Sequence, residues 1–269
     1  MIQLPDSALH PETQARLAQA QSEVDGIPDY AARVERAGQR FGSLNKKGNP
    51  TFDSVKETLT AMCSGARRCA YCEDSVADEV EHIWPKALYP ELAFAWKNYL
   101  YACGPCNGPK NNRFAVFASG TGALVQVARP RGAPVVPPLP GSPVLIDPRV
   151  EDPTDFMGLE LRGTFWFLPR APRGTPEHTR ADFTIRTLQL NTREYLPLAR
   201  ASAYRDYRAH LSHYIQERTQ SGTQEKILTL AQEIQTRQHP TVWREMKRQH
   251  LAIPELRRLF EAAPEALSW

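Results

Sequence analysis

The sequence lacks several patterns that would assign it to a class at once. No apolar run approaches the ~18 residues that a membrane-spanning helix needs, so we expect no membrane span. The opening residues are polar and do not follow the order of a signal peptide, so we expect a cytoplasmic protein whose cysteines stay reduced. The absence of a glycine-rich phosphate loop, an internal repeat and a heptad array argues against P-loop, solenoid and coiled-coil architectures.

The chain also has little excess charge of either sign. Its 269 residues carry a net charge of +3, and the isoelectric point is near 8.6. Such values suit a protein that meets nucleic acid, but proteins of many other kinds share them. The length allows one large domain or two small ones, with a real apolar core.

Cysteine is scarce, and its placement is informative. Four of the five cysteines form two Cys-x-x-Cys pairs, Cys69 with Cys72 and Cys103 with Cys106. Each pair lets two thiolates reach one metal from a tight turn, and two pairs complete the tetrahedral shell of a structural Zn²⁺ site. Buried free thiols and disulfides are the alternatives. A reducing compartment disfavours disulfides, and two Cys-x-x-Cys pairs in such a compartment favour a metal. Cys63 is expected to be a small core residue, with substitution for Cys69 as the lesser alternative.

Helical periodicity dominates both ends of the chain, whereas the middle is rich in proline. We expect helices at 11–24, at 29–41 with Gly42 as its stop, from about 53 to 62, from about 177 to 190, and at 192–219, 223–237, 242–250 and 254–262. Residues 118–176 hold eleven of the 23 prolines and a predicted hairpin, in which 157–161 pairs with 164–168 and the turn is Arg162-Gly163. The predicted domains are a helical segment (1–64), a core with the zinc knuckle (65–117), a connector (118–176) and a helical region (177–269).

The segment between the cysteine pairs carries residues suited to phosphodiester hydrolysis, which needs an activated water and a cation against the developing charge. His82 has an ordinary pKa of about 6.5, and its neutral form can take a proton from water. Its neighbour Glu81 offers the carboxylate oxygen that Mg²⁺ or Mn²⁺ accepts. Consecutive strand residues face opposite sides, so Glu81 and Ile83 should share one face and His82 the other. A distortion of the strand, or its end, for which Pro85 is the candidate, must then let both reach one phosphate.

Three further residues complete the candidate site. Asn107 follows the last cysteine, where a helix is expected, and its side-chain oxygen could be a second ligand of the catalytic metal. Lys110 lies three residues later on the same helix face and could meet a phosphate oxygen as a point charge. Asn98 is suited to hold the loop and orient His82 through hydrogen bonds. Each asparagine could instead cap a turn or a helix.

The order of these motifs resembles the HNH endonuclease family. The motifs on which this resemblance depends are Cys-x2-Cys, Glu-His-x-x-Pro-Lys, Trp-x-Asn-x-Leu and Cys-x2-Cys-Asn-x2-Lys. The resemblance implies an α+β fold, with a small beta-beta-alpha-metal core stapled by a four-cysteine zinc knuckle and flanked by N-terminal helices and a C-terminal helical bundle. It also implies His82 as general base, Asn98 as the middle asparagine, and Glu81 and Asn107 as ligands of the catalytic metal. Glu81 stands where Asp is more frequent, and Asn107 stands where the family more often has His, so metal preference stays open.

A narrower set of motifs is similar to the PtuB-like HNH proteins of Septu and retron antiphage systems. This similarity spans roughly residues 69–200 and includes Tyr89-Pro-Glu, Leu145-Ile-Asp-Pro and Thr184-Ile-x-x-Leu-x-Leu-Asn. It implies a partner ATPase of the AAA or ABC type, which no residue of this chain reveals.

Three functions are compatible with the sequence. The first is a Mg²⁺- or Mn²⁺-dependent nuclease that hydrolyses DNA, with RNA as an alternative substrate. The second is a non-catalytic, zinc-stabilised module that binds nucleic acid. The third is an interaction subunit whose residues 177–269 dock on the ATPase. Sequence specificity and the choice between nicking and double-strand cleavage do not follow from the residues.

Overall fold

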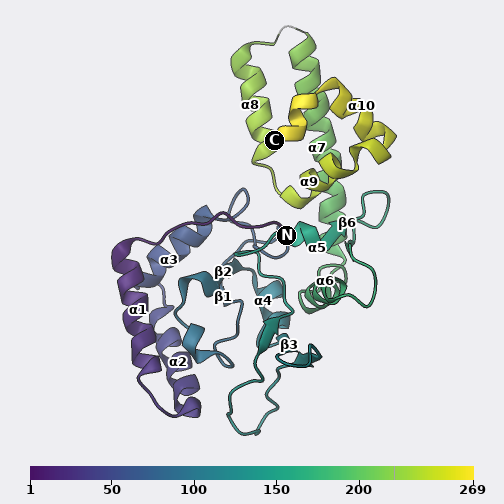
Figure 1. The fold of residues 1–269 in the computed structure, drawn as a ribbon. Coiled ribbons are helices and arrows are strands. Elements are labelled where there is room, and N and C mark those ends of the chain that lie inside the picture. Colours follow the sequence, from purple (N-terminus) through teal and green to yellow (C-terminus); the bar gives the residue numbers. More distant parts are fainter. Residues whose placement is uncertain (221) are drawn as a thin grey trace.

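The computed structural model describes residues 1–220 and 222–269, and it is a mixed helical and sheet structure (Figure 1). The helices are α1 (Pro11–Asp25), α2 (Tyr30–Leu44), α3 (Pro50–Ala61), α4 (Gly104–Lys110), α5 (Pro153–Phe156), α6 (Pro176–Thr187), α7 (Tyr195–Thr219), α8 (Gln224–Gln235), α9 (Pro240–Gln249) and α10 (Pro254–Ala262). The strands are β1 (Glu79–His82), β2 (Tyr99–Ala102), β3 (Ala115–Ala118), β4 (Leu124–Gln126), β5 (Gly141–Pro143), β6 (Met157–Leu159) and β7 (Phe167–Pro169). Throughout the described ranges no helix combines the length and the apolar character needed to cross a bilayer.

The predicted N-terminal helices are present, but two boundaries differ from the sequence prediction. α3 begins at Pro50 rather than near Asp53, because Asn49 caps it and proline suits the first helical position. α2 continues through Gly42 to Leu44. The prediction that Gly42 ends the helix is wrong, since an interior glycine costs a helix only about 1 kcal/mol relative to alanine.

The centre of the molecule is an antiparallel hairpin of β1 and β2, and α4 follows β2 directly (Figure 1). The register pairs Glu79 with Ala102 and His82 with Tyr99. Residues 83–98 connect the two strands and include two short 3-10 turns. Because strand side chains alternate, one face of β1 meets the N-terminal helices and the other meets α4.

Apolar packing covers the hairpin on both sides. On the side of the N-terminal helices, Phe41 and Phe52 pack with Val80 and Tyr99. On the other side, Leu100 belongs to a cluster that contains the four paired cysteines and extends into the C-terminal helices. Interiors packed in this way hold their side chains in fixed positions. The polar residues of β1 are therefore set into a rigid frame.

The proline-rich middle contains short strands in two sheets. β3 lies between β4 and β5, and β6 pairs with β7. Two strands do pair in the predicted hairpin region, but Met157 lies opposite Pro169 rather than Leu168, the strands are shorter and the loop is longer than expected. Glu160 explains the loop, because its carboxylate accepts the backbone N–H groups of Arg162, Gly163 and Thr164. The turn is thus organised by one side chain rather than by the Arg162-Gly163 pair alone.

The C-terminal helices occur close to their predicted ranges, and α10 matches its range at both ends. α7 runs from the central body into the lobe that α8, α9 and α10 form (Figure 1). The buried α-amino group of Met1 lies 3.0 Å from Glu73 Oε1 and donates to Thr241 Oγ1 at 2.7 Å. This contact joins the start of the chain, the loop after Cys72 and the first turn of α9.

Candidate functional site

The four paired cysteines converge on one point, and all are buried. Their sulfur atoms all lie within 4.8 Å of one another, and the Sγ atoms of Cys72 and Cys103 are 3.8 Å apart. With Zn–S bonds of about 2.3 Å, a regular tetrahedron separates its sulfurs by about 3.8 Å. The group therefore fits a zinc ion in both ligand type and spacing. Cys63 is not part of it: its half-buried thiol donates to Leu59 O at 3.3 Å.

Backbone geometry places the two cysteine pairs at the base of the hairpin. The first pair sits on a tight turn in which Cys69 N donates to Ser75 O at 2.9 Å. This turn is tied to β2 because Ala70 N donates to Tyr101 O at 3.0 Å. The second pair is held by secondary structure, because Cys103 directly follows β2 and directly precedes the first residue of α4. A metal ion at this point would fix the hairpin and the helix together.

One arginine from the C-terminal half reaches the cysteine group. Arg193 Nη2 donates to Cys106 Sγ at 3.1 Å and to Leu188 O at 2.9 Å. A cationic N–H group favours the thiolate form that a metal ligand requires. The segment between α6 and α7 therefore contributes to the surroundings of the metal site.

His82, the predicted general base, lies at the end of β1 with 4% of its surface exposed. Its Nε2 is 2.9 Å from Ala93 O, which also accepts the hydroxyl of Tyr99 at 2.8 Å. A carbonyl oxygen can only accept, so Nε2 must carry the proton of the neutral ring. Nδ1 then keeps its lone pair, and it has no hydrogen-bond partner among the described residues.

The surroundings of His82 favour its neutral form. Burial is the main cause that holds the pKa of this imidazole well below its ordinary value of 6.5, and the positive charges of Lys86 and Lys110 act in the same direction. The hydrogen bond to Ala93 opposes these effects only in part. The ring also packs edge-on against Phe41, with centroids 4.5 Å apart. Near neutral pH this residue is thus a fixed, uncharged proton acceptor.

Glu81 faces the opposite side of β1 and forms a buried ion pair with Lys110. The Nζ atom of Lys110 lies 2.5 Å from Glu81 Oε1 and donates to His82 O at 2.7 Å. Burial raises the pKa of Glu81, and the charges of Lys110 and Lys86 offset this only in part. We expected Lys110 to meet a phosphate oxygen, but its side chain has no exposed surface and its ammonium group is enclosed by protein acceptors. In this position it stabilises Glu81 and the end of β1.

Asn98 joins the two ends of the connection between the strands. Its Oδ1 accepts the backbone N–H of Trp84 at 2.8 Å, and its Nδ2 donates to Trp84 O and to Leu92 O at 3.0 and 2.9 Å. The side chain is buried, and both its oxygen and its nitrogen bond to backbone groups of the connection. These bonds hold the segment that also carries Ala93, the partner of His82. The geometry suits the supporting role that the sequence suggested.

Asn107 pairs with a residue that the sequence analysis missed. Its Nδ2 donates to Glu79 Oε2 at 2.6 Å, whereas Oδ1 has no hydrogen-bond partner in the described part of the chain. Glu79 lies two residues before Glu81 on β1, so both carboxylates face α4. The two-residue spacing from Glu81 could have indicated that Glu79 shares its face of β1. Only the position of α4 shows that Glu79 contacts Asn107.

The candidate residues meet in one cleft of about 350 Å³. Glu81, His82, Lys86 and Asn107 all line it, and Lys86 Nζ is 4.6 Å from the ring centroid of Phe41. Burial lowers the pKa of Lys86, and within residues 1–220 and 222–269 this lysine makes no ion pair. Oxygen donors suited to a hard cation are Glu81 Oε2, because Oε1 faces Lys110, and Asn107 Oδ1. The cleft thus combines the neutral imidazole of His82, the ammonium group of Lys86, and two oxygen atoms suited to a metal ion.

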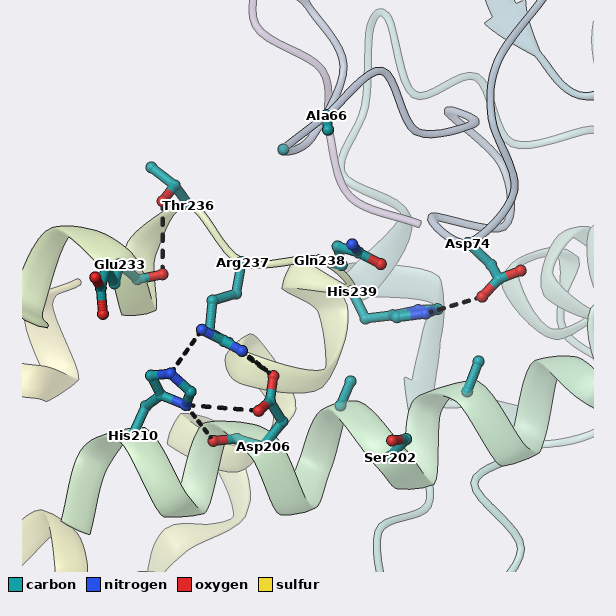
Figure 2. A pocket seen from close by; sticks show the side chains of 13 residues that line it. Ala66, Asp74, Ser202, Asp206, His210, Glu233, Thr236, Arg237, Gln238 and His239 are labelled. Carbon is teal, nitrogen blue, oxygen red and sulfur yellow. Dashed lines mark hydrogen bonds and ion pairs between the residues drawn. The ribbon is translucent and has the colours of Figure 1, made fainter. Parts of the chain in front are cut away.

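A larger cleft of about 800 Å³ lies elsewhere, between α7 and the connection from α8 to α9 (Figure 2). Several of its side chains pair with one another: Arg237 Nε donates to Asp206 at 2.8 Å, Arg237 Nη1 lies 2.8 Å from His210 Nε2, and His239 Nε2 is 3.4 Å from Asp74 (Figure 2). The contact between His239 and Asp74 joins the C-terminal lobe to the loop after the first cysteine pair. None of the predicted site residues lines this cleft.

Comparison with known proteins gives a partial similarity to a defence protein. The Septu protein PtuB of Bacillus thuringiensis is 36% identical over 70 residues, which are 24% of this chain and 27% of that protein. The similarity therefore spans about a quarter of the relative's length. No protein-family profile matches the chain, and no solved structure matches it.

Proposed function

We propose that this chain is a metal-dependent HNH endonuclease that hydrolyses phosphodiester bonds of DNA. The observation that carries the proposal is the state of His82, which lines one cleft together with Glu81 and Asn107. Its imidazole is neutral and has a fixed tautomer, and its Nδ1 has no hydrogen-bond partner among the described residues. A histidine that served only packing would not need oxygen donors for a hard cation beside it. The hairpin, α4 and the four-cysteine group support the proposal, because two strands, a helix and a four-cysteine cluster are what the motif order leads us to expect.

In the proposed reaction, His82 Nδ1 takes a proton from a water that attacks phosphorus in line with the departing 3′-oxygen. The P–O3′ bond breaks, and the 3′-oxygen leaves as an alcohol after protonation by solvent. A divalent cation held by Glu81 and Asn107 would supply positive charge against the phosphate and the leaving oxygen. Lys86 can contact a non-bridging oxygen, since this residue lines the cleft and its ammonium group has no carboxylate partner in the described chain. Lys110 and Asn98 support the site from the protein interior through their contacts with Glu81, His82 and the connection between the strands.

The similarity to a Septu protein supports a role in antiphage defence. We propose that the chain acts in the cytoplasm beside an ATPase of the AAA or ABC type, with DNA as the substrate and RNA as the alternative. A partner that engages the C-terminal helices would leave the hairpin cleft open to nucleic acid.

A second function, binding of nucleic acid without cleavage, is favoured by one observation. Glu81 is buried and already paired with Lys110, so only one of its oxygens is left for a cation. In a protein of this kind the zinc group would stabilise a binding surface, and His82 would be a packed core residue.

The test is cleavage of supercoiled plasmid and of total RNA by the zinc-loaded protein with Mg²⁺, Mn²⁺ or a chelator. Wild type should cleave with metal, and His82→Ala should lose about 10²- to 10⁴-fold in rate while zinc content stays the same. His213→Ala, an exposed histidine on α7, is the matched control and should cleave normally. Binding that survives His82→Ala with no cleavage by wild type under any metal would favour the second function.

A further inference from the structure

Glu79 and Asn107 make a contact that the proposed reaction leaves unexplained. Both residues line the cleft or its rim, and neither is buried. Yet Glu79 Oε2 and Asn107 Nδ2 are 2.6 Å apart, the distance of a strong charge-assisted hydrogen bond. Exposed pairs of this kind usually have water as an equally good partner. What the pair does fix is the direction of the Asn107 amide group.

The chemistry of the pair fixes which way the asparagine points. A carboxylate has only acceptor oxygens, so the NH₂ group of Asn107 must turn toward Glu79. The oxygen and the nitrogen of a carboxamide diverge from the same planar carbon, so Oδ1 points in a different direction from the Nδ2 that bonds to Glu79. Oδ1 makes no hydrogen bond within the described residues, and its residue lines the cleft beside Glu81. The oxygen is thus the end of the amide that remains available to a cation.

The local backbone is shaped to hold the carboxylate. Glu79 lies on the face of β1 that meets α4, and α4 begins with Gly104. A Cβ atom at Gly104 would lie only 3.3 Å from Glu79 Oε1, so the glycine leaves the space that the carboxylate occupies. Asn107 comes three residues later on the same helix. Strand alternation and the first turn of α4 together bring the two side chains into contact.

We infer that Glu79 is a positioning residue that orients Asn107 as a ligand of the divalent cation. This inference rests on the proposed function and names a further residue of the same site. Groups that orient metal ligands commonly change metal affinity by about 10- to 100-fold when they are removed. Without Glu79 the carboxamide is free to rotate, and its NH₂ group can face the cation in place of Oδ1.

The test compares Glu79→Ala and Glu79→Gln with Asp78→Ala. Asp78 is an exposed carboxylate that lines the same cleft but makes no bond to Asn107, so its loss controls for the removed charge. Binding of Mn²⁺ to the zinc-loaded full chain is measured by titration calorimetry and by the spectrum of free Mn²⁺. The concentration of Mg²⁺ at half-maximal plasmid cleavage is measured in parallel.

We expect Glu79→Ala to weaken Mn²⁺ binding and to raise the half-maximal Mg²⁺ concentration by about 10- to 100-fold, with near-normal turnover at saturating metal. Glu79→Gln should recover part of the loss, because its carbonyl can still accept from Nδ2. An equal effect of Asp78→Ala, or unchanged Mn²⁺ binding by Glu79→Ala, would overturn the inference. Turnover that saturating metal does not restore would also overturn it, since Glu79 would then do more than orient Asn107.

Failure of the inference and failure of the proposed function give different results. If wild type binds Mn²⁺ but cleaves nothing, the nuclease is refuted, and the effect of Glu79→Ala on binding still decides the inference. If wild type binds no Mn²⁺ in the cleft, both are refuted.

Discussion

Replacement of Lys110 by methionine tests whether this lysine stabilises the buried Glu81 carboxylate or contacts a phosphate group. Its Nζ lies 2.5 Å from Glu81 Oε1 and 2.7 Å from His82 O, and the side chain is fully buried. Methionine keeps the apolar stem but leaves the Glu81 carboxylate, which is 5% exposed, without its cation. Removing one partner of a buried ion pair costs about 3 to 5 kcal/mol. We expect Lys110→Met to lower the free energy of unfolding by about that amount and the melting temperature by about 10 °C.

Urea unfolding of the zinc-loaded protein measures the effect. Glu81→Gln removes the charge that Lys110 compensates, so the double variant should be less destabilised than the sum of the two single variants by about 1 to 3 kcal/mol. Lys97→Met is the matched control, because Lys97 forms an exposed pair with Asp6. That variant should change stability by less than about 1 kcal/mol. If Lys110→Met is as stable as Lys97→Met but binds nucleic acid more weakly, the lysine meets phosphate and the buried-pair argument is refuted.

Three further predictions concern the zinc group, the pH dependence and the loop. Cys103→Ser should release zinc and unfold the hairpin and α4, since structural zinc contributes roughly 10 to 16 kcal/mol of apparent binding free energy. Zinc content and circular dichroism measure these two effects. Cys63→Ser is the control and should keep its metal. Burial holds the pKa of His82 well below 6.5, so kcat/KM should stay level as the pH falls through 6.5, and a midpoint at 6.5 would contradict the burial. Because this folded-state pKa is lowered, His82 contributes stability above about pH 6.5 that is lost as the pH falls further, which urea unfolding of wild type against His82→Asn can measure. Asn98→Ala should cost about 1 to 3 kcal/mol and slow cleavage through the loss of its hydrogen bonds, whereas exposed Asn112→Ala should do neither.

Local signals in the sequence were enough for the helices and for the metal group. Helix-forming periodicity and turn residues depend on neighbours in the chain, so most helix ends are close to their predicted positions. Two Cys-x-x-Cys turns need only approach each other for their sulfurs to meet, and the sulfurs do meet within 4.8 Å. The predicted end of α2 was wrong because Gly42 does not stop the helix. The predicted start of α3 was wrong because Asn49 caps the helix and Pro50 is its first residue.

The roles within the cleft could not be derived in the same way. His82 and Asn107 were selected by residue type and motif order, and their assignment to catalysis stays a prediction. That Lys110 is enclosed, that Glu79 holds Asn107, and that Ala93 sets the tautomer of His82 are results of distant contacts. The boundaries of the four predicted domains also stay a prediction.

The amino-acid sequence by itself determined which side chains can bind a soft metal, which can accept a proton and which segments form helices, because these properties reside in single residues and their near neighbours. Only the tertiary structure decided which face of β1 each polar residue occupies and what it meets there. The reason is that α4 covers one face and the N-terminal helices cover the other, so each contact, charge balance and pKa depends on residues brought together by packing.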